Sequence, residues 1–261
     1  LSEPGVGSDF GGLEMAAVRV DGGWKLNGAK AWITNAAVAG LSVAYAQTDR
    51  AQGYRGIACF AIEADRPGFE RDKPFELHGG HAIGVGGFRL VDYFAPDEAV
   101  LHAPGKAFKA ALAGINGARA YVAAMCCGML QASLETAVRY TQQRQTFGQP
   151  VLDHQGVRWK LVDAATDLEA ARLLTYRAAR LIDEAGDAVL PAAHAKKFAT
   201  DMALRRIADC IQAMGANGLR AEYPLARHLA GAKIAAYTDG SIEMMNERIG
   251  AGLPAVFGKP A

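Results

Sequence analysis

The first hundred residues alternate short apolar runs with turn-forming residues. The runs "LEMAAVRV" and "WKLNGAKAWITN" flank Asp21-Gly22-Gly23, and "LSVAYAQT", "GIACFAIEA" and "GFRLVDYFA" follow with Pro and Gly between them. Because Gly accepts the positive φ of tight turns, Asp21-Gly22-Gly23 predicts a hairpin. About five strands without helical periodicity between them predict an antiparallel sheet or barrel over residues 1–103.

From residue 104 onward the apolar positions adopt a helical period. One stripe recurs every three or four residues and contains Val157, Leu161, Ala165, Leu168, Ala171, Thr175, Ala178 and Leu181. A second contains Phe198, Met202, Ile207, Ile211 and Met214, and residues 105–142 and 223–250 are two further apolar segments. Four such segments with short connections predict a helical bundle over residues 104–261. The chain is therefore expected to be an α+β protein, with an antiparallel β-barrel domain followed by a four-helix bundle.

The last apolar segment is interrupted. In "KIAAYTDGSIEMM", residues 233–245, the run breaks at Thr238-Asp239-Gly240-Ser241 before a second apolar stretch begins. In one interpretation, Asp239 or Ser241 caps the helix that starts near Ile242, because a side-chain oxygen there satisfies an unpaired backbone N–H. In the other, Asp239 is a catalytic base. The pattern of residues leaves both open.

The composition indicates a folded protein without a global electrostatic partner. Hydrophobic residues make up 51% of the 261, enough for a substantial core in one large domain or two smaller ones. Lys and Arg total 28 against 27 acidic residues, for a net charge of +1. The overall charge therefore predicts neither nucleic acid nor an anionic membrane as a partner.

The patterns of cysteine, histidine and hydropathy indicate in which cellular compartment the protein is found. Cys59, Cys126, Cys127 and Cys210 fit neither a disulfide framework nor a C-x-x-C motif, which indicates reduced thiols, and the six histidines lack metal-site spacing. No run reaches about 18 uninterrupted apolar residues and no signal-like start is present, so we expect a cytoplasmic protein without membrane insertion. Because the chain starts without Met at a turn-rich segment, a missing N-terminal portion is also expected.

Four segments, taken in order, resemble the acyl-CoA dehydrogenase family. "LSEPGVGSD" is similar to the family's T-E-P-G-x-G-S-D, and "LNGAKAWITN" is similar to its I-N-G-x-K-x-W-I-T-N. "ARAYVAAMCCGMLQASLETAVRYTQQRQTFGQPVLDHQ" resembles the stretch built around an Arg, a helix and R-x-x-F-G. "IQAMGANGLRAEYPLARHLAGAKI" resembles Q-x-x-G-G-x-G-x-x-x-E-Y-P followed by the R-D-A-K-I region. The resemblance rests on the order and intervals of these motifs and covers essentially the whole chain.

The resemblance implies an FAD enzyme that desaturates acyl-CoA thioesters between the α and β carbons. Its expected electron acceptor is an electron-transferring flavoprotein. The family has three domains, of which this chain would supply the middle β-barrel and the C-terminal helical bundle, with the N-terminal helical domain absent. Each flavin in the family is shared across a dimer interface, so a homodimer or homotetramer is expected.

The N-terminal motif would lie beside the flavin. By resemblance, Ser2 and Gly7 would lie along the flavin ring, and Ser8 near the flavin or the CoA chain. Gly5 and Gly7 suit that place because they let the backbone turn tightly and approach a flat ligand. An ordinary Gly-rich turn with a capping Ser is the alternative.

Trp32 and Thr34 are two apart in a predicted strand, so their side chains are expected to share one face. By resemblance, the indole would lie against the isoalloxazine and the hydroxyl at a ring acceptor. The alternative is a buried Trp that fills the barrel.

Two further segments would bind the adenosine-diphosphate part of FAD on the neighbouring subunit. Arg144, Thr146 and Phe147 follow a long predicted helix, where a cation and a hydroxyl suit a pyrophosphate. The alternative is a surface Arg at a helix C-terminus.

The second of these segments is the turn Gln212, Gly215, Ala216, Asn217 and Gly218, which resembles the family's Gln-x-x-Gly-Gly-Asn-Gly. Ala216 departs from the second glycine of that turn, and its methyl group could crowd the dinucleotide. Because a helix precedes the turn, it is not a strand-turn-helix dinucleotide fingerprint.

Substrate contacts are also implied. Arg119 matches a family arginine associated with CoA binding, and Asn116 stands where many relatives carry an acid that contacts the pantetheine arm. Ser8, Thr238 and Gly240 complete the expected substrate-binding set.

In most relatives the motif at the break reads Y-E-G-T, and its Glu takes the α proton while hydride leaves the β carbon for flavin N5. Aligning the glycine places Asp239 at the base, Thr238 at the Tyr and Ser241 at the Thr that contacts flavin. Hydrogen bonds to the thioester oxygen stabilise the developing enolate, and in the family one donor is the backbone N–H of the base residue.

Asp239 departs from the family's Glu by one methylene, about 1.5 Å of reach. A misplacement of about 1 Å can cost some hundredfold in rate. Some relatives carry the base on the helix of Arg119, but Ala118 precedes Arg119 here, and Glu243 aligns with a cofactor-contacting Gln. Three interpretations remain: a compensated base, a base for another regiochemistry such as alicyclic acyl-CoA oxidation, or a catalytically impaired subunit.

Two other function classes stay open. An acyl-CoA oxidase or flavin monooxygenase could use the same scaffold, because a fold does not determine which acceptor takes the electrons. A non-catalytic flavoprotein scaffold is the other, and the near-neutral charge argues against one that binds nucleic acid.

Overall fold

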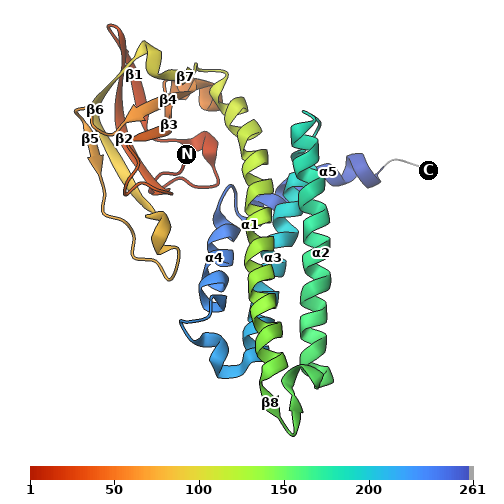
Figure 1. Cartoon of the computed structure of the whole chain (residues 1–261). Coiled ribbons are helices and arrows are strands. Elements are labelled where there is room, and N and C mark those ends of the chain that lie inside the picture. The colour runs from red at the N-terminus through yellow and green to blue at the C-terminus, as the bar shows by residue number, and fades with distance from the viewer. Residues whose placement is uncertain (259–261) are drawn as a thin grey trace. The chain divides into compact units, whose positions relative to one another are not determined.

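The structure, a computed structural model, describes residues 1–258. The chain divides into two compact units, Leu1–Gly114 and Ile115–Ala261, and the division falls inside helix α1 (Ala107–Gln143). The α+β composition predicted from the sequence is confirmed, with a seven-stranded sheet in the first unit and a mainly helical second unit (Figure 1). The domain boundary between residues 103 and 104 stays a prediction.

Seven strands form the sheet of the first unit. They are β1 (Ala16–Val20), β2 (Gly23–Ile33), β3 (Leu41–Gln47), β4 (Ile57–Glu63), β5 (Phe69–Arg71), β6 (Gly86–Pro96) and β7 (Val100–His102). The predicted hairpin is confirmed, because Val20 pairs with Gly23 across Asp21-Gly22 and Gly22 has a φ of 69°. Position 23 requires glycine for a different reason, because a Cβ there would lie 2.3 Å from the carbonyl oxygen of Ala95.

The sheet is mixed rather than purely antiparallel. Its strand order is β5-β6-β2-β1-β3-β4-β7, and β1 pairs with β3 in parallel through Ala16 and Gln47, whereas the other pairs are antiparallel. The prediction of an all-antiparallel sheet is therefore wrong at this pair, because the chain crosses from β2 to the far side of β1. The order ends at β5 and β7, so closure into a barrel is unconfirmed.

Small and aromatic side chains fill one core against this sheet. The buried set is Met15, Ala17, Leu26, Ala44, Ala46, Ala58, Phe60, Ile62, Phe88, Leu90, Tyr93 and Ala95. The Tyr93 hydroxyl accepts from the N–H of Glu63 at 2.9 Å and donates to its carbonyl at 3.3 Å. The buried phenol hydroxyl thus both donates and accepts a hydrogen bond, as is usual for buried polar groups.

The second unit contains α1 from residue 115 onward and four further helices. These are α2 (Gln155–Asp183), α3 (Val189–Met214), α4 (Leu225–Tyr237) and α5 (Ile242–Phe257). A short hairpin of β8 (Gln145–Thr146) and β9 (Gln149–Pro150) connects α1 to α2. The four predicted apolar segments are therefore helical, with the last one divided into α4 and α5 at the predicted break.

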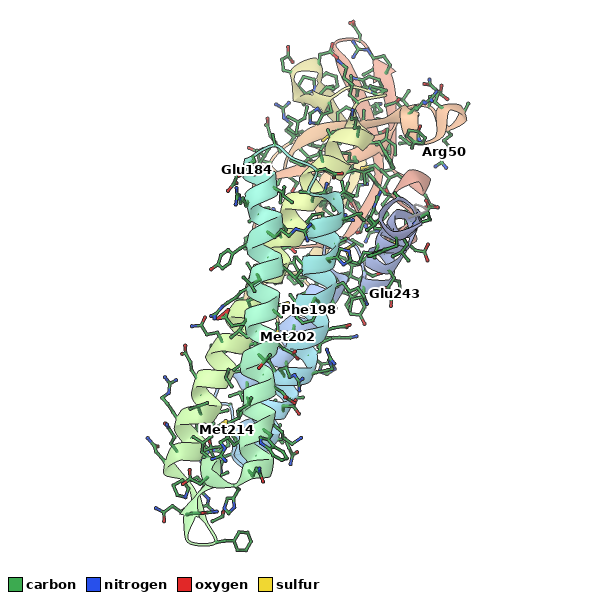
Figure 2. All side chains as sticks on the ribbon, turned by 90° about the vertical axis from the view of Figure 1, so that its right-hand side faces the viewer. Arg50, Glu184, Phe198, Met202, Met214 and Glu243 are labelled. Atoms are coloured by element: carbon green, nitrogen blue, oxygen red, sulfur yellow. The ribbon has the colours of Figure 1, made fainter. Side chains whose placement is uncertain are left out.

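Alanine and sulfur-containing residues dominate the core of this unit. Ala123, Cys126 and Leu130 of α1 pack with Ala164, Leu168 and Ala171 of α2 and with Ala199, Met202 and Ile207 of α3. Figure 2 labels Met202 near the middle of α3 and Met214 at its C-terminal end. Small side chains at facing positions let helices approach closely. Polar side chains are buried in the same unit as well, among them the two cations Arg119 and Lys196.

By length and composition alone, α1 is the one helix among the described residues that could cross a membrane. Core helices of soluble proteins have the same properties, and α1 contributes many residues to the core of the helical unit. Its apolar character is therefore a weak indication, and the absence of membrane insertion stays a prediction.

Candidate functional site

The connector between α4 and α5 is formed by residues 238–241. Asp239 has a φ of 55° and Gly240 a φ of 94°. Among residues other than Gly, Asp is one of the few enriched at positive φ, so the Asp-Gly pair suits this sharp turn. Thr238 ends α4, with both its N–H and its hydroxyl donating to the carbonyl oxygen of Ile234.

Ser241 caps α5. Its Oγ accepts from the N–H of Met244 at 3.5 Å, and its backbone is extended as an N-cap residue requires. The capping interpretation is therefore correct for Ser241 and wrong for Asp239. The same hydroxyl also hydrogen-bonds Glu243, which lowers the pKa of that exposed carboxyl.

Buried cations hold three consecutive carbonyls of the connector. Lys196 Nζ donates to the carbonyl oxygens of Thr238 and Gly240, and Arg119 Nε donates to that of Asp239 at 3.3 Å. Lys196 is 0% exposed and Arg119 is 6% exposed. The backbone on both sides of Asp239 is thus anchored from α1 and α3.

The carboxylate of Asp239 is left without an internal donor. Within residues 1–258 no hydrogen bond or ion pair engages its oxygens, although Lys196 and Arg119 bind the backbone beside it. Partial burial raises the pKa of Asp239, and the charges of Lys196 and Arg119 oppose that rise. A partly desolvated carboxylate with no fixed donor is available to take a proton from a ligand.

Arg119 also joins two other predicted residues. Its Nη1 donates to Oδ1 of Asn116 at 3.2 Å, one turn earlier on α1. A Cβ at Gly240 would lie 3.6 Å from Nη2 of Arg119, so the glycine keeps this contact uncrowded. The predicted residues Asn116, Arg119 and Asp239 therefore lie together with Thr238 and Gly240.

Lys196 belongs to this cluster but was not among the predicted site residues. It lies on the stripe of Ala192, Ala199 and Ala203, at helical spacing on the buried face of α3. A lysine at a core position was the signal that the sequence offered, since Lys is almost never fully buried without a partner.

In the first unit, the N-terminal motif is held by a buried ion pair. Lys30 Nζ lies 2.7 Å from Oε1 of Glu3, with 1% and 2% of the two side chains exposed. Glu3 also accepts from the N–H groups of Glu14 and Met15, and the carbonyl of Ser2 accepts from the N–H of Ala31 at 3.0 Å. Both charged residues lie inside motifs quoted from the sequence, yet neither was predicted as functional.

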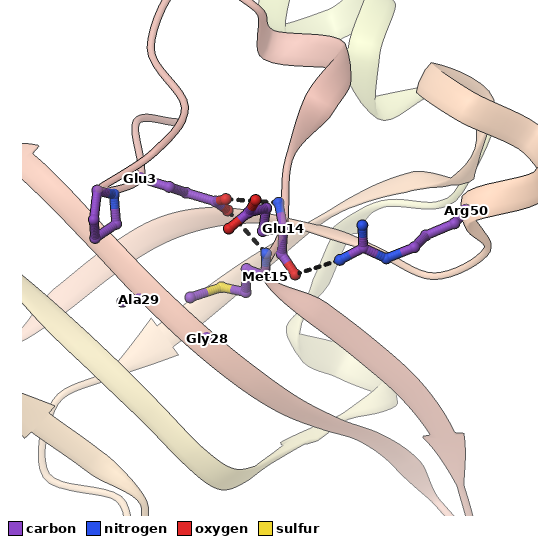
Figure 3. Close-up of a pocket in the computed structure, with 7 residues that line it drawn as sticks. Glu3, Glu14, Met15, Gly28, Ala29 and Arg50 are labelled. Carbon is purple, nitrogen blue, oxygen red and sulfur yellow. Dashed lines mark hydrogen bonds between the residues drawn. The ribbon is translucent and has the colours of Figure 1, made fainter.

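A pocket of about 380 Å³ lies beside this pair (Figure 3). Its lining is Glu3, Pro4, Glu14, Met15, Gly28, Ala29 and Arg50. Figure 3 shows its polar groups bonded to one another, with Arg50 donating to the carbonyl of Glu14 at 3.3 Å. None of the predicted site residues lines it, so it is not our candidate site.

The backbone conformation does not require glycine at position 5 or position 7. Neither has a positive φ, although the chain does turn tightly at Gly5, where the N–H of Val6 donates to the carbonyl of Glu3 at 3.2 Å. A Cβ at either would meet no atom within 4 Å, and Ser8 beside them is exposed.

Trp32 and Thr34 do not share a strand face. Strand β2 ends at Ile33, Trp32 has a φ of 61°, and the pairing with β6 shifts register between Lys30 and Ile33. The alternation on which the prediction rested is interrupted by this bulge. Trp32 is 61% exposed and its ring lies 4.7 Å from that of Phe75, so it does not fill the core.

Arg144, Thr146 and Phe147 lie at the β8–β9 hairpin, directly after α1. Phe147 and Gly148 have φ of 50° and 78°, the two positive values of a tight hairpin turn. His154 holds the hairpin, with Nε2 3.1 Å from both Thr146 Oγ1 and Thr146 O. The ring of Phe147 is 98% exposed at the tip.

The turn after α3 lies at the same end of the helical unit as this hairpin (Figure 1). Asn217 Nδ2 donates to the hydroxyl of Tyr140, one turn before the hairpin, at 2.7 Å. Gly215 has a φ of 61° with open space at its Cβ position, whereas a Cβ at Gly218 would lie 2.7 Å from the carbonyl of Ile211. Gln212 and Ala216 are exposed, so the Ala216 methyl meets no internal obstacle.

Comparison with known families covers both units. Residues 1–92 match "Acyl-CoA dehydrogenase, middle domain", and residues 105–253 match "Acyl-CoA dehydrogenase, C-terminal domain". The short-chain-specific acyl-CoA dehydrogenase of Megasphaera elsdenii is 37% identical over 245 residues. That alignment covers 94% of this chain and 64% of the relative, so the chain spans just under two thirds of the relative's length.

Solved structures agree in fold. The butyryl-CoA dehydrogenase of Megasphaera elsdenii superposes with a TM-score of 0.94 at 36% identity, covering 97% of this chain and 66% of that one. A chain from a study of the electron-transferring flavoprotein of Acidaminococcus fermentans superposes with a TM-score of 0.95 at 34% identity. It covers 99% of this chain and 67% of that one.

Proposed function

Since this chain belongs to the acyl-CoA dehydrogenase family, we propose that the protein is an FAD-dependent acyl-CoA dehydrogenase that desaturates a thioester between its α and β carbons. The observation that carries the proposal is the Asp239 carboxylate, partly buried and without an internal donor, at the connector where the family's base is expected.

Asp239 takes the α proton in this proposal. The α carbon of a thioester is a weak acid, so proton removal needs a positioned carboxylate and donors to the thioester oxygen. The N–H of Asp239 has no acceptor within residues 1–258, which suits it to be one such donor. Because the Asp239 side chain is shorter than the Glu of most relatives, the connector must bring its carboxylate closer to the substrate.

The residues present fit FAD. Gly5, Gly7 and Gly215 each leave open space where a side chain would stand, as a closely approaching cofactor requires. We assign the flavin-ring side to Ser2, Gly7, Ser8, Trp32, Thr34, Ser241 and Glu243. The chemistry that FAD supplies when bound is acceptance of hydride from the β carbon.

We assign the adenosine-diphosphate part of FAD to the end of the helical unit that carries the β8–β9 hairpin and the turn after α3. Arg144, Thr146 and Phe147 of the hairpin and Gln212, Gly215 and Ala216 of the α3 turn would hold it. Arg144 and Phe147 are exposed and unused by the core of this unit, which supports contact with a neighbouring subunit. A homodimer or homotetramer is part of the proposal.

The CoA thioester would be bound by Ser8, Asn116, Arg119, Thr238 and Gly240. Arg119 already bonds Asn116 and the Asp239 carbonyl, so its cationic head also steadies the base. The names of the relatives suggest a short acyl chain as the first substrate to test. An electron-transferring flavoprotein as acceptor and a cytoplasmic location complete the proposal.

The test is anaerobic titration of the complete protein with a panel of acyl-CoAs, beginning with butyryl-CoA, followed at the flavin absorbance band. The dehydrogenase assignment predicts bleaching by at least one member and slow reoxidation in air. Reoxidation within milliseconds would instead support an oxidase or monooxygenase. Retained flavin that no acyl-CoA bleaches would support the catalytically impaired scaffold.

A further inference from the structure

Lys196 binds the connector rather than only capping a helix. The carbonyls that Lys196 holds belong to Thr238, the C-cap residue of α4, and to Gly240, two residues further along the connector. A lysine that only capped α4 would bond carbonyls at the helix end and would have no contact with Gly240. The two contacts therefore fix the path of the chain on both sides of Asp239.

The position of Lys196 is energetically costly. Its side chain is 0% exposed, and within the described residues no carboxylate forms an ion pair with it. Burial lowers its pKa to about 8. A buried ammonium that is hydrogen-bonded only to carbonyls, with the charge of Asp239 nearby but not paired with it, is unfavourable relative to an apolar side chain of similar volume, so its presence calls for a role beyond packing.

Peptide geometry connects Lys196 to the proposed reaction. A peptide unit is planar and trans, so its C=O and N–H point in opposite directions. When Lys196 holds the carbonyl of Thr238, it also fixes the direction of the N–H of Asp239, which has no acceptor within residues 1–258. Arg119 holds the next carbonyl in the same way.

We propose that Lys196 is a positioning residue that aims the N–H and the carboxylate of Asp239 at the substrate by holding the carbonyls of Thr238 and Gly240. The role rests on the proposed function, because the N–H and carboxylate act on the thioester. Arg119 of α1 holds one of the three connector carbonyls, and Lys196 holds the other two.

The charge of Lys196 has a second effect. The groups that act on it are Asp239 of the connector and Arg119 and Cys126 of α1, while Arg248 of α5 acts on Arg119. Burial raises the pKa of Asp239, and Lys196 is the larger of the two cationic influences that lower it. Loss of the Lys196 charge therefore moves the ionisation of Asp239 to higher pH.

The test compares three variants of the complete, FAD-loaded protein. Lys196→Met removes the donors and the charge, whereas Lys196→Arg keeps both. Lys197→Met is the matched control, because it removes the same charge from the next position of α3, where the side chain is partly exposed and paired with Asp201 at 3.9 Å. If Lys196→Met fails to fold, Lys196→Gln replaces it as an uncharged donor.

Two readouts are measured on each variant. Deuterium uptake over residues 234–245 reports how firmly the connector is held, independent of any reaction. Anaerobic flavin reduction by the best acyl-CoA, followed against pH, reports the reaction. We expect Lys196→Met to increase uptake in this segment, slow reduction about 10- to 100-fold and move the acid limb to higher pH with flavin content unchanged. Lys196→Arg recovers part of the rate, and Lys197→Met behaves like the unmodified protein.

The proposal and the function on which it rests fail differently. If acyl-CoA reduces the unmodified protein but Lys196→Met shows the same uptake, rate and acid limb, the role of Lys196 is overturned. A slower Lys196→Met whose acid limb and connector uptake do not move would also overturn it. An unmodified protein that no acyl-CoA reduces would overturn the proposed function and, with it, the assignment of Lys196 to that reaction.

Discussion

Lys30 Nζ lies 2.7 Å from the Glu3 carboxylate, and this pair fastens the N-terminal motif to strand β2. Glu3 accepts two further hydrogen bonds from backbone N–H groups, so its charge is compensated at several points. Loss of Lys30 would leave the buried Glu3 carboxylate without its counter-ion, which is costly even though the two N–H donors remain.

Lys30→Met is therefore expected to lower the free energy of unfolding by about 3 to 5 kcal/mol. Lys25→Met, on the same strand, is the matched control, because Lys25 lies 3.8 Å from Asp92 with both side chains well exposed. The control should cost less than about 1 kcal/mol. Urea unfolding of both variants checks this, and equal losses would show that burial of the Glu3–Lys30 pair is unimportant.

Ser241→Ala removes the side-chain acceptor that caps α5 and is expected to destabilise the protein by about 1 kcal/mol. Ser241→Asp keeps an acceptor and should retain most of the stability. Thermal unfolding of flavin-free protein separates the cap from the proposed flavin contact of Ser241. A loss of the same size in both variants would refute the capping role.

The pH dependence of flavin reduction follows from the raised pKa of Asp239. Only the ionised carboxylate accepts a proton, so the rate falls as the pH drops through that pKa. The midpoint of the acid limb should lie above the ordinary Asp value of about 3.9. A profile of single-turnover reduction rates against pH measures it, and a midpoint below that value would contradict the burial of the base.

Phe147→Ala tests the exposed tip of the β8–β9 hairpin. Because the ring is 98% exposed, its loss should change the free energy of unfolding by less than about 0.5 kcal/mol. If the tip binds the cofactor of a neighbouring subunit, the variant should nevertheless lose FAD on gel filtration. Val38→Ala, an exposed turn residue of the first unit, is the control expected to change neither. A Phe147→Ala protein that keeps FAD as firmly as the control would remove the hairpin from the proposed site.

Much of the fold could be predicted from local patterns. The Asp21-Gly22 turn, the four apolar segments and the break at residues 238–241 are all local features, and the structure has each of them. Strands β5 and β7 were not predicted because each has only three residues, too few for an alternating pattern. The parallel pairing of β1 with β3 depends on the path of the chain in space, which no local pattern encodes.

The site was predictable where a motif carried it and not where tertiary packing made it. Asn116, Arg119 and Asp239 were predicted by resemblance and lie together. The shared face of Trp32 and Thr34 failed because a bulge with a positive φ at Trp32 is not visible in an alternating sequence. Lys196 was missed because its role depends on a contact with residues more than forty positions away.

The most direct measurement is anaerobic flavin reduction in Asp239→Asn of the complete protein, mixed with the acyl-CoA that best reduces the unmodified protein. Asn keeps the backbone N–H and nearly the same shape but cannot accept the α proton. The account predicts that flavin content stays unchanged and that substrate-dependent bleaching is abolished. Bleaching at the unmodified rate would contradict the assignment of Asp239 as the base.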